Sequence, residues 1–191
     1  MAALEIVSIG EPILRATARL VADDELRSDG FQRLLDDLVE TMRAADGAGL
    51  AAPQVGVGLR AFVVEVRDNP RYPYKPELSL RILVNPTVRP VSNEAFEVIE
   101  GCLSVPDLRG RLRRFGEVEV AYTTREGDQQ VETIRGLSAG TFQHEQDHLD
   151  GILFVDRVED TRTLTTWEAY RRHQEAAWTA EAEAIVARWG S

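Results

Sequence analysis

Five short segments of β-branched and apolar residues, grouped in the middle of the chain, constrain its fold more than any other feature of the sequence. They occupy residues 59–66, 80–84, 95–99, 117–123 and 131–134, and each is bounded by Gly, Pro, Asn or Asp. In the last two, apolar residues alternate with charged neighbours, as in strands with one buried face. The segments do not alternate with helical patterns, as the strands of a parallel sheet would. We therefore predict an α+β fold with mainly antiparallel β-sheets.

Three stretches show helical patterns. Residues 31–45 carry apolar side chains at helical spacing, and Ser28 or Asp29 can cap their start. Ser138 is a candidate N-cap for a helix that ends at Leu149, and residues 161–189 are typical of one long C-terminal helix. Residues 68–76 hold three prolines and predict a loop. We expect one domain over residues 1–191, with the sheets packed around the 138–149 helix and residues 161–191 as a helical extension.

Composition narrows the function. The formal net charge is −10, which argues against broad binding to nucleic acid or to anionic lipid. A single cysteine excludes an internal disulfide and fits a reducing compartment. The N-terminal residues lack the basic start of a signal peptide, and no apolar run approaches the roughly 20 residues that span a bilayer. We therefore predict a cytoplasmic protein with no membrane partner and no direct nucleic-acid partner.

A pair of histidines carries the strongest chemical signal. His144 and His148 lie four residues apart in the predicted 138–149 helix, so both imidazoles can reach one metal ion from the same face. Glu145 lies next to the first histidine, where a carboxylate can take a proton from an activated water without binding the metal. The chain has only three histidines, which makes an accidental HExxH pattern improbable.

The identity of the third ligand separates two classes of hydrolase. In the extended form of the zinc-protease motif a glycine and a third histidine follow the pair, and the chain has Gly151 but Phe154 at these positions. A downstream glutamate is the other protease solution, and the sequence offers Glu159, Glu168 and Glu175. Cys102 is the remaining candidate, because it follows a predicted strand and a glycine in a turn that would expose its sulfur.

Three segments together resemble the signature motifs of the peptide deformylase family. They are residues 47–54 (Gly-Ala-Gly-Leu-Ala-Ala-Pro-Gln), 100–104 (Glu-Gly-Cys-Leu-Ser) and 143–151 (Gln-His-Glu-Gln-Asp-His-Leu-Asp-Gly). Residues 10–15, 85–86 and 109–114 are also similar to that family, so the resemblance covers roughly the first 160 residues. One such motif would be suggestive, whereas three in this order and spacing are highly specific.

The resemblance implies a metal-dependent amidohydrolase that removes the formyl group from the N-terminal formylmethionine of newly made polypeptides. Cys102, His144 and His148 would bind one divalent metal ion, natively Fe²⁺, with Zn²⁺, Ni²⁺ or Co²⁺ as substitutes. A metal-activated water would be the nucleophile, with Glu145 as general base and then general acid. The Gln54 amide and the Leu103 backbone N–H would stabilise the oxyanion.

The resemblance also implies a substrate-binding set and partners. The expected substrate-binding residues are Gly47, Gly49, Val98, Glu100, Gly101, Leu137, Gly140 and Thr141. The substrates would be N-formylmethionyl nascent peptides, and some relatives use a basic C-terminal tail to contact the ribosome transiently. Here the arginines of residues 161–191 are matched by glutamates, so a helix packed on its own domain is an equal alternative. We also expect ion pairs around the site among Glu100, Arg109, Arg114 and Asp147.

Two other functions compete with this prediction. A zinc-dependent endoprotease of the HExxH type comes second, and it would not depend on Cys102. A non-catalytic metal-binding relative comes third. Glu145 argues against it, because a structural site would not need this carboxylate and usually has four protein ligands.

Overall fold

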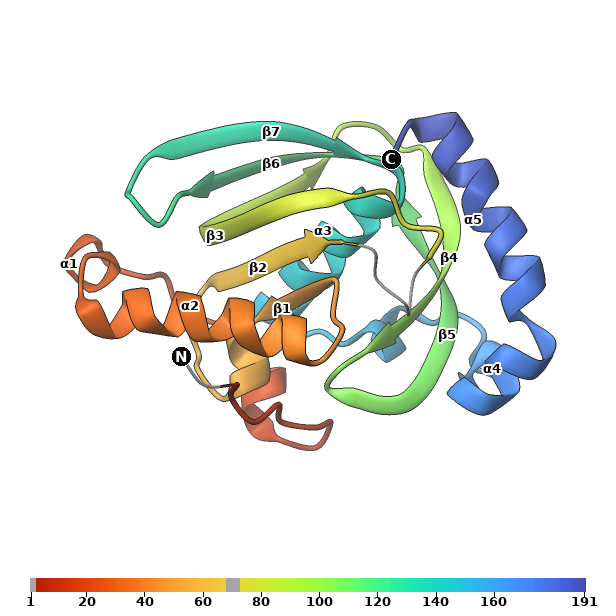
Figure 1. Ribbon diagram of the computed structural model, residues 1–191, viewed down its shortest axis with the longest axis horizontal. Coiled ribbons are helices and arrows are strands. Elements are labelled where there is room, and N and C mark those ends of the chain that lie inside the picture. The colour runs from red at the N-terminus through yellow and green to blue at the C-terminus, as the bar shows by residue number, and fades with distance from the viewer. Residues whose placement is uncertain (1–2, 68–72) are drawn as a thin grey trace.

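The protein folds into two antiparallel sheets, and the fold class predicted from the sequence is confirmed (Figure 1). The structure, a computed structural model, describes residues 3–67 and 73–191. The α-helices are α1 (Asp23–Leu26), α2 (Asp29–Ala44), α3 (Gly136–Leu149), α4 (Trp167–His173) and α5 (Glu175–Trp189). The strands are β1 (Gly49–Ala51), β2 (Ala61–Val66), β3 (Leu78–Pro90), β4 (Ala95–Cys102), β5 (Val105–Phe115), β6 (Glu117–Thr123), β7 (Gln129–Arg135) and β8 (Thr165–Thr166).

The larger sheet has five strands in the order β1-β2-β3-β6-β7. Strand β2 is buried along its whole length, because α2 covers one face of the sheet and α3 the other. Helix α2 begins where the Ser28 hydroxyl accepts a hydrogen bond from the backbone N–H of Phe31, at 3.2 Å, as the sequence predicts. Its apolar stripe packs on β1, β2 and β3 through side chains that include Leu35, Leu38 and Met42.

The smaller sheet has three strands in the order β4-β5-β8. Strand β4 pairs with β5 from Ala95 opposite Phe115 to Gly101 opposite Arg109. The sequence patterns did not predict β5. Its buried positions include Gly110 and Arg114, which do not form the apolar alternation of an ordinary strand.

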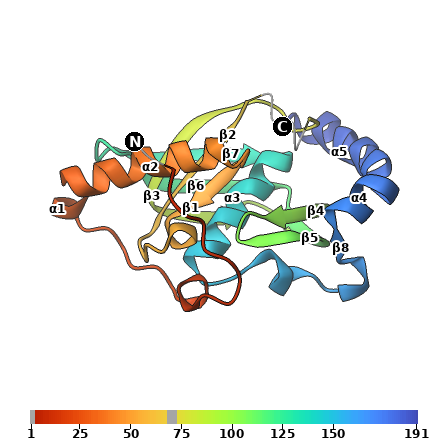
Figure 2. The same cartoon turned by 60° about the horizontal axis from the view of Figure 1, so that its bottom comes forward.

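Helix α3 packs against both sheets and carries the HExxH motif (Figure 2). The prediction that Ser138 caps its start is wrong. The helix begins at Gly136, with Arg135 at the N-cap, and the Ser138 hydroxyl instead hydrogen-bonds the Ser191 hydroxyl at 2.7 Å. Gly136 has a φ of +57°, which favours glycine, and a Cβ there would clash with the backbone of Ser191. Ser191 therefore lies against the first residues of α3.

The predicted single helix over residues 161–189 is also wrong. The segment contains a 3₁₀ turn (Thr161–Thr163), β8, α4 and α5, with a break at Gln174. Threonine-rich residues 161–166 favour extended backbone and turns. The Thr166 hydroxyl caps α4 by accepting a hydrogen bond from Ala169 N at 3.3 Å. The break gives α4 and α5 different directions along β4 and β5 (Figure 1).

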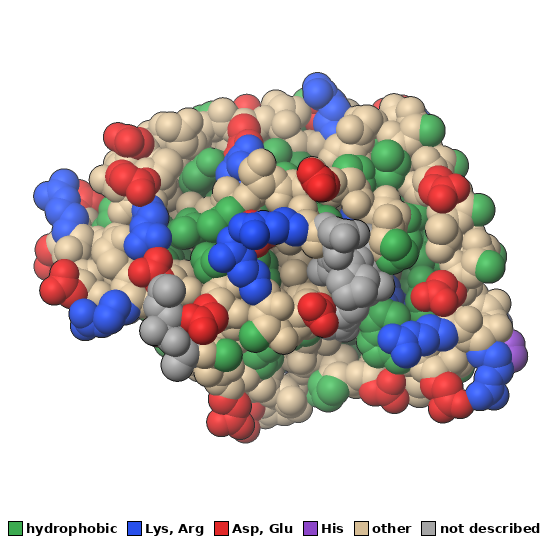
Figure 3. Space-filling model, viewed as in Figure 1, with side chains coloured by type: hydrophobic (Ala, Val, Ile, Leu, Met, Phe, Trp, Pro, Cys, Tyr) green, Lys and Arg blue, Asp and Glu red, His purple; other side chains and the backbone are tan. Residues whose placement is uncertain are grey.

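Two other sequence predictions concern loops and membranes. Of the predicted loop 68–76, residues 68–72 lie outside the described part, and residues 73–76 form no helix or strand. Within the described residues, no helix is long and apolar enough to cross a bilayer. Acidic and basic side chains are interspersed over the face of the molecule in Figure 3. The single-domain organisation stays a prediction.

Candidate metal centre and cleft

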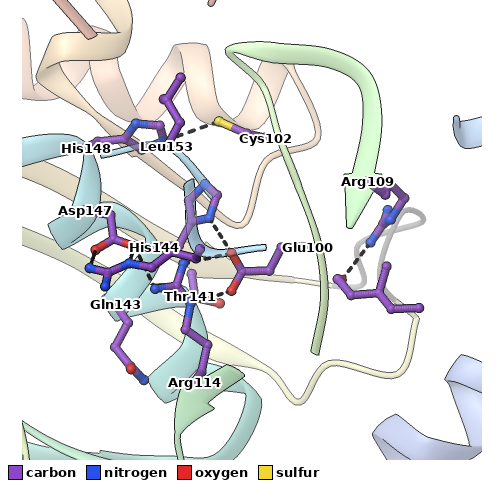
Figure 4. A network of polar contacts seen from close by, with 12 residues as sticks. Glu100, Cys102, Arg109, Arg114, Thr141, Gln143, His144, Asp147, His148 and Leu153 are labelled. Atoms are coloured by element: carbon purple, nitrogen blue, oxygen red, sulfur yellow. Dashed lines mark hydrogen bonds and ion pairs between the residues drawn. The ribbon is translucent and has the colours of Figure 1, made fainter. Parts of the chain in front are cut away.

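Cys102, His144 and His148 meet at one buried point. Cys102 ends β4, and the two histidines come from successive turns of α3. One ligand atom from each of the three lies within 4.8 Å of the others, and all three residues are buried or nearly so. The Cys102 Sγ and His148 Nε2 are 3.3 Å apart (Figure 4). The two imidazole rings are 5.0 Å apart at their centroids.

This cluster fits a divalent cation. Bond lengths of about 2.3 Å to sulfur and about 2.0–2.1 Å to nitrogen in a tetrahedral site put such ligand atoms roughly 3.5 Å apart. The observed separation of Sγ and Nε2 is close to that value. Burial lowers the pKa of His148 well below its ordinary value, so this imidazole is neutral, as a ligand must be. Among the described residues, no fourth His, Cys, Asp or Glu joins the cluster.

A buried ion-pair network orients His144. Its Nδ1 lies 2.8 Å from a carboxylate oxygen of Glu100, which leaves Nε2 to face the cluster (Figure 4). Arg114 donates to both oxygens of Glu100, at 2.8 and 2.9 Å, and to Asp147 at 2.7 Å. Burial works against ionisation of Glu100, but Arg114 lowers its pKa far below the ordinary value. The prediction of ion pairs among these residues is confirmed for Glu100, Arg114 and Asp147.

Arg109 has a different environment from Arg114. Its guanidinium donates to the backbone carbonyl of Ile99 at 3.2 Å. It also stacks against Trp167 and Tyr170, with distances of 4.2 and 4.5 Å to the ring centroids. Arg109 therefore joins the C-terminal helices to the strands of the smaller sheet.

Glu145 lies in the same cleft as the cluster, and its side chain passes over β1. A Cβ built on Gly49 would lie 2.7 Å from the Cδ of Glu145 and 2.8 Å from its Cγ. Burial raises the pKa of Glu145 to about 7, although the nearby charges of His144 and Lys75 lower it. The Oε2 atom is buried and has no hydrogen-bond partner within the described part of the chain. A carboxylate with these properties can accept and return a proton near neutral pH.

The Gln54 side chain is fixed in one orientation beside the cluster. Its Oε1 accepts a hydrogen bond from the backbone N–H of Ala51 at 2.8 Å. The amide nitrogen is therefore turned toward the Cys102 sulfur, at 3.5 Å, and the Ser104 hydroxyl, at 3.2 Å. This arrangement holds an N–H donor at the edge of the cleft.

One cleft brings together almost every residue singled out from the sequence. It encloses about 660 Å³, its open mouth included. The predicted residues that line it are Gly47, Gly49, Gln54, Val98, Glu100, Gly101, Cys102, Leu103, Leu137, Gly140, Thr141, His144 and Glu145. His148 does not line the cleft, although it is buried within the same cluster.

Six further residues line the cleft without having been predicted as catalytic, metal-binding or substrate-binding: Ala48, Tyr74, Lys75, Ile99, Arg109 and Trp178. Tyr74 and Lys75 come from the segment before β3, and Trp178 comes from α5. The Lys75 ammonium donates to the Thr141 hydroxyl at 2.8 Å, and burial lowers its pKa to about 8. Its status as the only lysine of the chain was the available signal. Trp178 belongs to a buried hydrophobic cluster with Val98 and Leu137, which agrees with the alternative of a C-terminal helix packed on its own domain and also brings the indole to the cleft.

The residues that would provide the third ligand in a zinc protease do not belong to the metal cluster. Phe154 is fully buried in the hydrophobic core, and no downstream glutamate of the described chain belongs to the cluster. The fold and the site define a mixed α/β protein with a buried Cys-His-His centre beside a glutamate, which is typical of metal-dependent hydrolases.

Comparisons with known proteins identify the family. The family model for polypeptide deformylase matches residues 3–163. "Peptide deformylase 2" of Nostoc is 44% identical over 168 residues, which cover 88% of this chain and 93% of that protein. The peptide deformylase of Leptospira biflexa is 43% identical over 163 residues, or 85% of this chain and 91% of that protein.

Solved structures agree with these relatives. A class I type b peptide deformylase from Acinetobacter baumannii, bound to Met-Ala-Ser, has a TM-score of 0.79 at 42% identity. The matched region covers 82% of this chain and 99% of the Acinetobacter chain. The peptide deformylase of Thermotoga maritima has a TM-score of 0.74 at 32% identity, over 84% of this chain and all of that one. The chain belongs to the polypeptide deformylase family.

Proposed function

We propose that this protein hydrolyses the N-formyl group of N-terminal formylmethionine on newly made polypeptides and releases formate. The observation that carries the proposal is the buried Cys-His-His cluster with the carboxylate of Glu145 in the same cleft. We infer the reaction from membership of the family, and the cleft contains the residues that this reaction requires.

Cys102, His144 and His148 would hold the metal ion. When bound, a divalent cation would activate a water molecule and polarise the formyl carbonyl. The mixed sulfur and nitrogen donors suit Fe²⁺, Zn²⁺, Ni²⁺ or Co²⁺, and we expect Fe²⁺ as the native ion. Metal analysis of protein purified without oxygen tests this choice. Glu100 would keep His144 in the ligating orientation through its hydrogen bond to Nδ1.

Glu145 would move the proton. Its pKa of about 7 lets the carboxylate take a proton from the attacking water and then give it to the departing methionine nitrogen.

Two donors would stabilise the charge that develops on the formyl oxygen. One is the Gln54 amide nitrogen, whose direction is fixed by the hydrogen bond from Ala51 N. The other is the backbone N–H of Leu103, the residue that follows Cys102. Each such donor is worth about 100–1,000-fold in rate in other hydrolases.

The remaining cleft residues would hold the peptide. Val98, Leu137, Gly140 and Thr141 would surround the methionine side chain. Strands β1 and β4 are both edge strands, and an extended peptide can pair with such an edge through its backbone. The glycines at 47, 49 and 101 would allow this close approach. The relative from Acinetobacter baumannii, which binds Met-Ala-Ser, supports a peptide of this kind.

Formate release from formyl-Met-Ala-Ser tests the proposal directly. We expect rapid release by the Fe²⁺ or Ni²⁺ form and loss of release after chelation. Glu145→Gln should lower kcat by about 100–10,000-fold with unchanged metal content. Glu159→Gln, the same change at an exposed position outside the cleft, should have no effect. Absence of formate release by folded, metal-loaded protein would refute the assignment.

Two finer points belong to the same proposal. A Cys102→Ser variant that kept its metal and its catalysis would favour the endoprotease alternative.

A transient contact between the C-terminal helices and the ribosome, and a cytoplasmic location, stay predictions. Replacing Arg171 and Arg172 with glutamate should weaken cosedimentation with ribosomes, and unchanged cosedimentation would remove these arginines from the contact.

A further inference from the structure

The C-terminal helices contribute a wall to the cleft. Trp178 of α5 lines the cleft, and its side chain is 1% exposed. It belongs to the same hydrophobic cluster as Val98 and Leu137, which face the cleft from β4 and α3. The match to the family model ends at residue 163, before α4 and α5 begin. A side chain from outside the matched region therefore borders the proposed methionine pocket.

The wall around Trp178 contains a second aromatic ring. The Tyr74 ring meets the indole edge to face, with 5.9 Å between the centroids and an interplanar angle of 89°. Its neighbour Lys75 is tied to Thr141 of α3 by a hydrogen bond of 2.8 Å. Two segments far apart in sequence, residues 74–75 and α5, thus close the cleft on the same side.

The indole is the largest side chain that lines the cleft, and the lining has space beside α3. Gly140 contributes no side chain, and a Cβ built there would only reach ordinary contacts of 3.8 Å with Arg114 and Phe96. The indole N–H of Trp178 is buried and has no acceptor among the residues that the structure describes. A hydrogen bond within that part of the chain therefore does not explain a tryptophan at this position.

Several contacts hold α5 in place. Glu181, one turn after Trp178, pairs with Arg111 of β5 at 2.8 Å. At the end of the helix, the backbone carbonyl of Ser191 accepts a hydrogen bond from Leu137 N at 3.0 Å. The indole is therefore fixed relative to both β5 and α3, as a wall that discriminates by size must be.

We propose that Trp178 determines which first residue the cleft accepts, by setting the size limit of the pocket for that side chain. The inference rests on the proposed deformylase activity and deepens it. Long, unbranched apolar side chains such as that of methionine fit against the indole, and broad aromatic side chains are excluded. The C-terminal helices are then part of substrate recognition.

The test compares formate release from formyl-Met-Ala-Ser and formyl-Phe-Ala-Ser. Trp178→Ala should raise the kcat/KM ratio of the Phe to the Met peptide by about tenfold or more, the usual range for a changed apolar pocket. Trp178→Phe should raise it less. Trp189→Ala is the matched control. It removes the same side chain from the same helix, where the ring packs near Gly116 and not in the cleft, and should leave the ratio unchanged.

The outcomes separate the two proposals. If the wild type releases no formate from either peptide, the deformylase assignment itself fails. If the wild type is active and folded Trp178→Ala keeps the wild-type ratio, the role of Trp178 is overturned. An equal change in Trp189→Ala would overturn it too, because helix packing alone would then explain the effect. If circular dichroism shows that Trp178→Ala does not fold, an unchanged ratio in Trp178→Phe is the refuting result.

Discussion

The closeness of Gly49 to Glu145 gives the sharpest prediction from this structure. Gly49 lies in β1 without a positive φ, so alanine suits its backbone, and the strand should still pair with β2. The added methyl group, however, would lie 2.7 Å from Cδ of Glu145. Gly49→Ala should therefore damage catalysis while it leaves the fold intact.

The size of the effect follows from the displacement that the methyl group requires. Ordinary van der Waals contact lies at 3.4–4 Å, so the carboxyl carbon must move by about 3.4 − 2.7 = 0.7 Å to reach it, and the nearer Oε1 atom must move with it. Misplacing a catalytic group by about 1 Å can cost about 100-fold in rate. We expect kcat to fall by roughly that factor, with metal content unchanged.

Formate release from formyl-Met-Ala-Ser measures the effect, and thermal unfolding monitors the fold. Gly30→Ala is the control, because it makes the same change in α2, where a Cβ meets nothing within 4 Å. It should keep full activity and be at least as stable as the wild type, since alanine favours helix over glycine.

A double-mutant cycle decides whether the effect acts through Glu145. In a Glu145→Gln background the base is already lost, so adding Gly49→Ala should cost little more. If the two changes instead lower the rate by independent factors, the steric explanation is wrong. Wild-type activity in Gly49→Ala would also refute it.

Three other perturbations follow from the same structure. Arg114→Ala leaves the buried Glu100 carboxylate without its arginine, while Asp147 keeps its ion pair with Arg157, so the free energy of unfolding in urea should fall by about 3–5 kcal/mol, more than in Arg114→Lys. Gln54→Ala should lower kcat for formate release by about 100–1,000-fold and keep the metal. Ion pairing with Arg43 lowers the pKa of buried Glu65, so its stabilisation is present above the ordinary value of 4.5 and is lost as pH falls below it. Wild-type unfolding free energy should thus drop more steeply on acidification than that of Glu65→Gln, and equal slopes would refute this.

The sequence predicted well those elements whose pattern reflects simple burial. Strand β6 has the predicted bounds, because Val118, Val120 and Tyr122 face the core while their neighbours do not. Strand β5 was missed because its buried face carries Arg114, which is stable inside only through two carboxylates from other elements. A local pattern contains no information about such distant partners.

The residues of the site divide in the same way, into those with a local sequence signal and those without one. The pairing of His144 and His148 follows from helical spacing, whereas Cys102 was implied only by the resemblance to the deformylase motifs, because β4 and α3 are far apart in sequence. Tyr74 and Trp178 have no local signal of this kind. The place of Trp178 in the cleft depends on the direction of α5 after the break at Gln174, where α5 packs against α3 and β4. Tyr74 reaches the cleft from the segment before β3.

The location of the three ligands has a consequence for folding. Cys102 belongs to the smaller sheet, and the two histidines belong to a helix that also packs on the larger one. A bound cation would act as a removable cross-link that closes the loop between residues 102 and 144. The binding site exists only once this docking is complete, so metal affinity adds directly to the free energy of unfolding. Metal supply would then govern how long the protein survives in its folded form, as well as how fast it turns over.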